Sequence, residues 1–212
     1  MSRYANAREF LQAVMNRYRS ISGYSDEGVS YSYGRGHRSV CTFRSDYRQP
    51  RLFRFSFSRS HPYKPLSHII TSYAIGSDGK QAYFYSRSFE GKEELELEKS
   101  LEMAVAGATG ISSGTAHTIG ELLFDEIGGF SFLDLKRIRF RRTREIDGVH
   151  CVAISGLHPN GGRITAWFGV DDLLLRRKLR KHSRGKTDEL RFRVKSDSAC
   201  SPEFFYIPKI EN

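Results

Sequence analysis

A pentapeptide in the middle of the chain, Gly110-Ile-Ser-Ser-Gly114, matches G-x-S-x-G, the nucleophile motif of α/β-hydrolases. Acidic and histidine residues follow it in the chain order that these enzymes use, namely Asp125, Asp134, Asp147, His150, His158 and His182. The motif needs a strand before its serine and a helix after it, whereas residues 101–108 favour helix. We therefore interpret Ser112 as part of a helix-to-helix connection and assign no catalytic residue. A serine esterase that uses Ser112 is the alternative enzymatic hypothesis.

Metal and cofactor chemistry has little support in the residue pattern. Three histidines, His37, His61 and His68, lack both the i, i+4 helical spacing and the nearby carboxylates that a metal site uses. Gly185-Lys-Thr187 is similar to the end of a phosphate-binding loop, but position 180 is arginine where that motif needs glycine. We predict no metal site and no cofactor.

Basic residues alternate with apolar residues in two predicted strands. Arg137, Arg139 and Arg141 form one such stripe, and Arg191, Arg193 and Lys195 form the other. With a formal net charge of +10, this pattern fits a solvated outer sheet face, an anionic membrane surface or a nucleic acid. Nucleic-acid modules interleave aromatic and basic side chains, whereas strand alternation here sends them to opposite faces, so nucleic acid is not the expected partner.

Aromatic residues form the most pronounced pattern in the chain. Phe53, Phe55 and Phe57 alternate with polar residues, so their rings share one face of a strand. A turn signal at Asp78-Gly79 leads into a second aromatic strand around Tyr83 and Tyr85. We expect these five rings to share the inner side of a sheet, where they cover a core, a partner or a lipid-like ligand.

The elements that position these residues follow from periodicity and turn signals. Residues 4–20 have the spacing of an amphipathic helix. Residues 93–124, rich in Glu, Leu and Ala, predict two short helices broken near 107–114. Alternation and turns predict strands over the other segments: 23–36, 40–47, 50–58, 69–75, 82–86, 137–141, 152–154, 163–170, 173–180, 190–195 and 204–207.

Strands in long runs indicate an α+β fold with an antiparallel sheet. We predict a strongly curved, open half-barrel of about nine to eleven strands, with an N-terminal helix and a mid-chain helical pair over its concave face. The length of 212 residues and the 39% hydrophobic content predict one domain over residues 1–212. No stretch reaches the roughly 18 to 20 apolar residues of a membrane span. The redox state of three scattered cysteines is left open: Cys41, Cys151 and Cys200.

The order of these features resembles the LolA/LolB-like lipoprotein carrier superfamily. The resemblance rests on the N-terminal helix, the Gln49-Pro-Arg-Leu-Phe53 step, the Ser77-Asp-Gly-Lys80 turn, the helical insertion and the closing Phe204 to Pro208. In the carrier protein of this family, an arginine directly precedes the proline that corresponds to Pro50. This sequence has Gln49 at that position, and Arg48 comes before it. This difference favours a general binder of hydrophobic ligands over a lipoprotein shuttle.

The resemblance implies an extracytoplasmic, periplasmic protein whose leader peptide is missing from this sequence. It further implies non-enzymatic binding of a lipid or a lipoprotein acyl chain in a cavity between sheet and helices. Peripheral contact with an anionic membrane surface is the expectation from the basic stripes. The alternative to the carrier and the esterase is a protein-interaction module that fills its own cavity. The expected cavity residues are Phe53, Phe55, Phe57, Tyr83, Tyr85, Leu101, Val105, Ile119, Leu122, Leu123, Phe140, Ile154 and Phe168.

Overall fold

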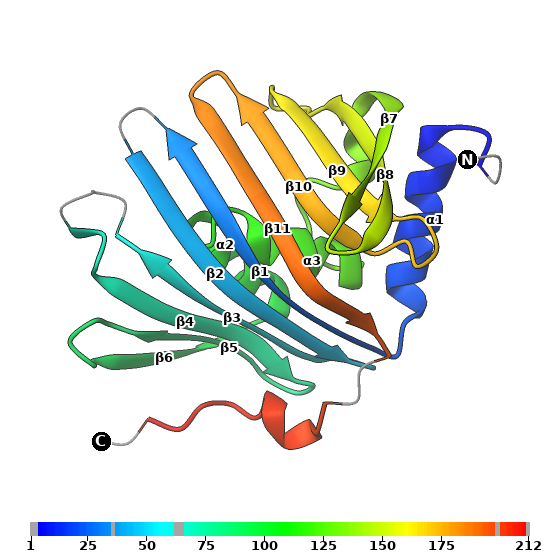
Figure 1. The fold of residues 1–212 in the computed structure, drawn as a ribbon. Helices are drawn as coiled ribbons and strands as arrows, with labels where there is room; N and C mark the ends of the chain where they lie inside the picture. Colours follow the sequence, from blue (N-terminus) through cyan, green and yellow to red (C-terminus); the bar gives the residue numbers. More distant parts are fainter. Residues whose placement is uncertain (1–3, 35–36, 62–65, 198–199, 211–212) are drawn as a thin grey trace.

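The computed structural model describes residues 4–34, 37–61, 66–197 and 200–210. Over these ranges the chain forms one antiparallel sheet of eleven strands, in the order β6-β5-β4-β3-β2-β1-β11-β10-β9-β8-β7 (Figure 1). The strands are β1 Gly23–Gly34, β2 His37–Arg48, β3 Leu52–Ser60, β4 Ile70–Asp78, β5 Ala82–Arg87, β6 Glu93–Glu98, β7 Lys136–Ile146, β8 Val149–Leu157, β9 Arg163–Gly169, β10 Leu175–His182 and β11 Gly185–Ser196. The sheet is open, with β6 and β7 at its edges. The predicted α+β half-barrel is confirmed.

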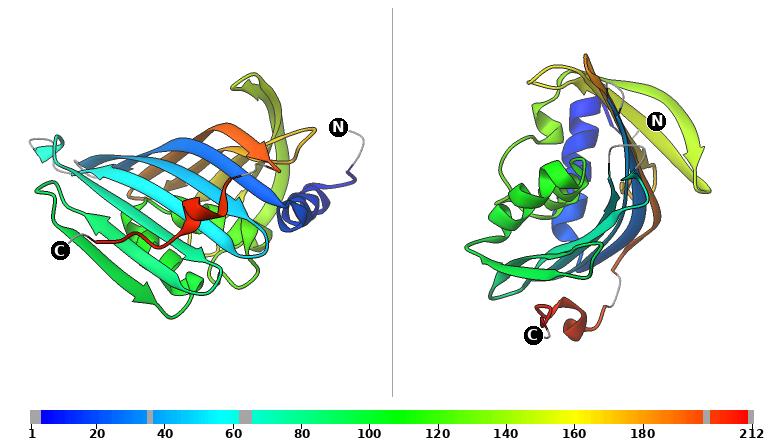
Figure 2. Two further views of the ribbon diagram at one scale, coloured as in Figure 1. Left: turned by 90° about the horizontal axis from the view of Figure 1, so that it is seen from below. Right: turned by 90° about the vertical axis from the view of Figure 1, so that its left-hand side faces the viewer.

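Three α-helices of the described chain lie on one side of the curved sheet, as the right-hand view of Figure 2 shows. They are α1 Ala7–Ser20, α2 Leu101–Ile111 and α3 Thr115–Leu123. The Asn6 side chain caps α1 by accepting the amide hydrogens of Arg8 and Glu9, and Ser100 caps α2 through Met103. None of the helices among the described residues is long and apolar enough to cross a membrane.

The core lies between the concave face of the sheet and these helices. Helix α1 buries one face, including Phe10, Leu11 and Val14, and packs against α3, β7 and the 3₁₀ helix η2 Phe132–Asp134. Helix α2 packs against α3 and against β4, β5 and β6. The helices therefore divide the concave face, with α1 beside the β7 end and α2 over the β4–β6 end.

Two predicted elements are wrong. Residues 93–98 form the edge strand β6 and not the start of a helix, because Leu95 and Leu97 alternate with glutamates and pair with β5; the helix begins only after the Ser100 cap. The glutamates of this segment therefore line a strand and not a solvated helix face. At the other end, Phe204 lies in the 3₁₀ helix η3 Pro202–Phe205, and no strand closes the described chain there. Helix η3 packs on the outer side of β3 and β4, with Phe205 fully buried (Figure 2).

Candidate ligand-binding site

The phenylalanines of β3 form an aromatic wall on the concave face. Phe53, Phe55 and Phe57 are all buried in the main core, as their shared face predicted. Rings of adjacent elements extend the wall. Phe55 stacks on Phe43 of β2 at 5.6 Å between ring centroids, and Phe57 stacks on Tyr73 of β4 at 4.8 Å. Helix α2, which packs against β4 and β5, lies over the β4 side of this wall.

The expected placement of Tyr83 and Tyr85 on this wall is wrong. Strand β5 pairs Phe84 with Ile75, which in turn pairs with Phe55, so Phe84 points to the concave side. Tyr83 and Tyr85 pair with Gly76 and Ala74 and therefore point to the convex side. Tyr83 is fully buried there, while Tyr85 is half-buried.

The other expected cavity residues come together on the concave side. From the helices, Val105, Ile119, Leu122 and Leu123 are buried in the core, and Leu101 packs against it. From the far half of the sheet, Ile154 and Phe168 are buried, and Phe140 packs against the same cluster. These side chains contact one another, so the protein's own residues fill the concave side. Their role in binding a ligand stays a prediction.

A buried charge network that the alternation pattern missed lies beside this apolar region. Arg191 was expected on the outer face, but its side chain is fully buried and pairs with Asp26 and with Glu189, at 2.5 Å for the latter. The reason is an irregularity in the β1–β11 pairing, where Arg193 has a positive φ of 50°. This bulge puts Arg191 on the concave face, opposite Gly28.

The network continues to the neighbouring strand β10. Lys178 lies 3.3 Å from the Glu189 carboxylate and donates a hydrogen bond to Thr118 of α3. Burial alone would raise the pKa of Glu189, but Lys178 and Arg191 hold it below its usual value. For Arg191, burial lowers the pKa, but Asp26 and Glu189 raise it well above its ordinary value. Both groups of this buried pair are therefore charged, and the network ties α3 to the centre of the sheet.

Helix α2 rests on the aromatic wall through a small apolar contact. A Cβ atom added at Gly107 would lie 3.7 Å from the Phe84 ring, while one at Gly110 would meet no atom within 4 Å. Two polar contacts hold its ends. The Arg59 Nη1 donates to the Ile111 carbonyl at 3.0 Å, and the Gly128 amide donates to Glu102 Oε1 at 3.3 Å.

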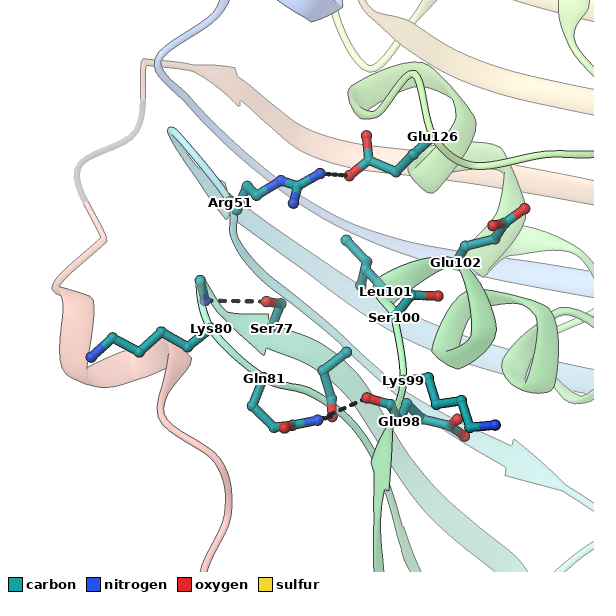
Figure 3. A pocket seen from close by; sticks show the side chains of 12 residues that line it. Arg51, Ser77, Lys80, Gln81, Glu98, Lys99, Ser100, Leu101, Glu102 and Glu126 are labelled. Carbon is teal, nitrogen blue, oxygen red and sulfur yellow. Dashed lines mark hydrogen bonds and ion pairs between the residues drawn. The ribbon is translucent and has the colours of Figure 1, made fainter.

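Hollows flank α2 at both of its ends. At its N-terminal end lies a polar pocket of about 390 Å³, shown in Figure 3. There Arg51 points to Glu126 at 2.5 Å, and the Gln81 amide donates to the Glu98 carbonyl at 2.7 Å. At the C-terminal end, a pocket of about 300 Å³ lies between Ile111, Arg59 and Tyr73. Both ends of α2 therefore border open space.

A smaller, mainly apolar pocket of about 110 Å³ lies at the other end of the concave face. Its lining includes Tyr4, Phe10, Phe140, Val152 and Val170, from α1 and its preceding residues to the end of β9. Of the expected cavity residues, only Phe140 lines this pocket. It has room for a few methylene groups beside the N-terminus of α1.

The G-x-S-x-G match lies at the junction of α2 and α3. The Ser112 side chain is fully buried; its hydroxyl donates to the Thr109 carbonyl at 3.4 Å and accepts the Ala116 amide hydrogen at 3.1 Å. Within the described chain, neither a histidine nor a carboxylate hydrogen-bonds to this hydroxyl. Ser112 therefore stabilises the start of α3, as the helix-to-helix interpretation predicted.

Comparisons with known proteins identify the fold. No protein-family model and no curated protein matches the chain. Among solved structures, the chain is similar to the Mycobacterium tuberculosis lipoprotein LppX, with a TM-score of 0.56, 12% identity and coverage of 92% of this chain and 96% of that one. It is similar to LprF from Mycobacterium bovis, with a TM-score of 0.53, 14% identity and coverage of 92% and 94%. The chain thus shares the fold of these two structures, and it has the open, curved α+β architecture that the sequence resemblance predicted.

Proposed function

We propose that this protein binds a hydrophobic molecule, a lipid or the acyl chain of a lipoprotein, between the concave aromatic wall and helix α2, without catalysing a reaction. The main supporting observation is the position of α2. This helix packs over the aromatic wall, and a pocket lies at each of its two ends. Each buried methylene of a ligand contributes about 0.8 kcal/mol. Insertion of part of one acyl chain therefore gives useful affinity.

Binding requires α2 to move, because side chains of the protein fill the space beneath it. The connection to α3 provides a hinge. Gly114 has a φ of +86°, and a Cβ atom added there would meet no atom within 4 Å. The charge network holds α3 to the sheet through Thr118 and Lys178. In this mechanism α3 stays in place while α2 swings outward and uncovers Phe55, Phe57 and Phe84.

An extracytoplasmic location is part of the proposal. It is supported by the fold shared with a mycobacterial lipoprotein. The finer assignment to the periplasm follows from the family resemblance.

Crosslinking α2 to the sheet tests the proposal. Cysteines replace Gly107 and Phe84, because a Cβ atom at position 107 would lie 3.7 Å from the Phe84 ring; Cys200→Ser removes the partly exposed native cysteine. We expect a fluorescent fatty acid to bind to the reduced protein and to be excluded after a short bifunctional thiol-reactive reagent, such as a bis-maleimide, joins the two cysteines. When the reagent used is cleavable, binding should return after it is cut. The single Gly107→Cys protein treated in the same way is the control. Equal uptake by crosslinked and reduced protein would show that the ligand enters elsewhere.

A protein-interaction module with a filled interior is the second candidate function. The favouring observation is the buried network of Arg191, Asp26, Glu189 and Lys178, which occupies concave surface that a purely apolar cavity would leave to a ligand. Native mass spectrometry distinguishes the two candidates. A carrier retains lipid from its expression host or takes up added fatty acid, whereas an interaction module does neither.

A fluorophosphonate probe tests the esterase alternative. We expect the native protein to remain unlabelled, because the Ser112 hydroxyl is buried and no histidine of the described residues hydrogen-bonds to it. The Ser112→Ala variant is the matched control. Stoichiometric labelling of the native protein that disappears in this variant would reverse the assignment and identify a serine hydrolase.

A further inference from the structure

A cationic pocket of about 300 Å³ lies where the α2–α3 connection meets strands β9, β10 and β11. Its basic lining residues are Lys178, Arg180, His117 and His158, and Phe130 and Ile164 form an apolar side. No carboxylate is among the described residues that line it. Ile164 belongs to the main core and Phe130 packs against it, so the pocket adjoins the apolar interior.

The charges around this pocket do not balance. Arg191 pairs with Asp26 and Glu189, and Lys178 pairs with Glu189, all on the concave face. Arg180 lies on the same face, next to Thr187, and has no ion pair in the part of the chain that the structure describes. Its Nε atom is buried and has no hydrogen-bond partner. Asp26 and Glu189 are thus both used in ion pairs with Arg191 and Lys178, and neither pairs with Arg180. Arg180 as a whole is half-buried, and a half-buried cation with no carboxylate partner is stabilised by an anion bound in the pocket.

Two histidines, His117 and His158, also line the pocket, and their surroundings determine whether their rings are protonated. His158 accepts the Asn160 amide hydrogen at Nδ1, at 3.0 Å, so the proton of its neutral ring is on Nε2. Its ring packs on Phe130 at 4.3 Å between centroids. Burial lowers the pKa of His158, and the charges of Arg180 and Lys178 lower it further. Burial also lowers the pKa of His117, with Lys178 contributing. Both rings are therefore neutral near pH 7, and the positive charge of the pocket comes from Lys178 and Arg180.

We propose that this pocket binds the anionic headgroup, a phosphate or a carboxylate, of the hydrophobic ligand, with Arg180 as its principal contact. The inference rests on the proposed function, because it assigns the polar end of the same ligand. A guanidinium presents paired N–H donors that match the oxygens of both anions. Phe130 and Ile164 lead from the headgroup to the apolar interior, and the pocket adjoins the α2 hinge at Gly114. A headgroup bound here lies beside the α2–α3 connection, at the C-terminal end of the helix that must move.

Calorimetric titration with three probes tests this site: dodecyl phosphate, dodecanol and inorganic phosphate. We expect dodecyl phosphate to bind more tightly than either of the others. Arg180→Gln should weaken dodecyl phosphate about 10- to 100-fold, as the loss of a charged hydrogen bond does, and leave dodecanol within about twofold. Arg180→Lys, which keeps the charge but loses the paired donors, should fall between. Lys181→Gln is the matched control, since it removes the same charge from an exposed neighbouring residue of β10.

The probes separate failure of the headgroup site from failure of the proposed function. If dodecanol binds but Arg180→Gln leaves dodecyl phosphate unchanged, the headgroup assignment is overturned and hydrophobic binding stands. If inorganic phosphate binds as tightly as dodecyl phosphate and both depend on Arg180, the pocket is a site for a free anion, and the headgroup assignment is again overturned. If neither amphiphile binds, both proposals fail. Thermal unfolding of each variant verifies that it is folded.

Discussion

At the scale of single residues, Phe55 shows how tightly the aromatic wall is packed. Its ring is fully buried between Phe43 and Phe57, at 5.6 and 5.4 Å. Phe55→Ala should lower the free energy of unfolding by about 3 to 5 kcal/mol, as truncation of a packed core ring does. Tyr85→Ala, on the half-buried convex side of β5, is the control and should cost about 1 kcal/mol. Urea denaturation measures both.

A small effect at Phe55 would contradict close packing of the wall. If Phe55→Ala costs no more than Tyr85→Ala, the ring borders open or ligand-filled space. In that case, delipidation of the wild-type protein should lower its own stability, because removal of a ligand that binds only the folded state is destabilising.

Alternation along one strand was enough to predict which residues share a face, as with Phe53, Phe55 and Phe57. It could not predict which residues of the neighbouring strand lie on that same face of the sheet. The register between β4 and β5 places Phe84, and not Tyr83 or Tyr85, opposite Ile75, and register depends on contacts between strands. Arg191 was missed for a similar reason. A bulge in the pairing of β11 with β1 shifts the register, so the basic side chain of Arg191 points to the core and not to the outer face.

At the scale of elements, Glu121 lies in α3 where α1 and α3 meet. Its side chain is buried, and the Arg19 side chain of α1 donates to its backbone carbonyl at 2.8 Å. Burial raises the pKa of Glu121 to about 7. The hydrogen bond from Ser131 and the positive charge of Arg19 lower this pKa, but by less than burial raises it. Its Oε1 atom has no hydrogen-bond partner. Contact between the two helices should therefore weaken when Glu121 ionises.

This raised pKa predicts how stability changes with pH. Between its ordinary pKa of 4.5 and about 7, the folded state binds the Glu121 proton more tightly than the unfolded state does, so stability falls as pH rises. Glu121→Gln should match the wild type near pH 4.5 and exceed it at pH 8, by roughly 2 to 3 kcal/mol. Urea denaturation across this pH range measures the difference. Asp125→Asn, an exposed partner of Arg19, is the control. A constant offset between variant and wild type would show that Glu121 does not titrate in this window.

The boundary between β6 and α2 shows that local composition does not determine secondary structure by itself. Residues 93–98 have a helical composition, yet they continue the sheet because the edge of β5 offers unpaired backbone groups. The glutamates of this edge strand point to solvent or to nearby basic groups, such as Arg87 and Lys92. Such tertiary pairing overrides propensity, and a single sequence does not reveal it. The N-terminal helix, capped by Asn6, was predicted over residues 4–20 and spans Ala7–Ser20. Helix α2, by contrast, was expected to begin at residue 93 and begins at Leu101, after the Ser100 cap.

At the scale of the whole molecule, the two edges of the sheet carry opposite charge. Strand β7 has six basic residues and one glutamate, whereas β6 has four glutamates and no basic residue. In the described part of the chain, none of the β7 arginines forms an ion pair. The strands lie at opposite ends of the sheet order, so the molecule is electrically polar (Figure 1). An anionic membrane would therefore orient the protein with β7 toward its surface.

Binding to vesicles tests this orientation. We expect the protein to sediment with phosphatidylglycerol vesicles at low salt and to be released as ionic strength rises, since exposed charges are screened. Arg139→Gln combined with Arg141→Gln should weaken binding about 10- to 30-fold, because each basic residue near the surface contributes about 1 kcal/mol. Arg87→Gln combined with Lys92→Gln removes the same charge at the β6 end, where both residues pair with glutamates, and should have little effect. Equal losses in the two double variants would mean that net charge alone attracts the protein, with no preferred edge. If the wild type does not bind at low salt, the basic strand is a solvated sheet edge, and a ligand must reach the concave face from solution.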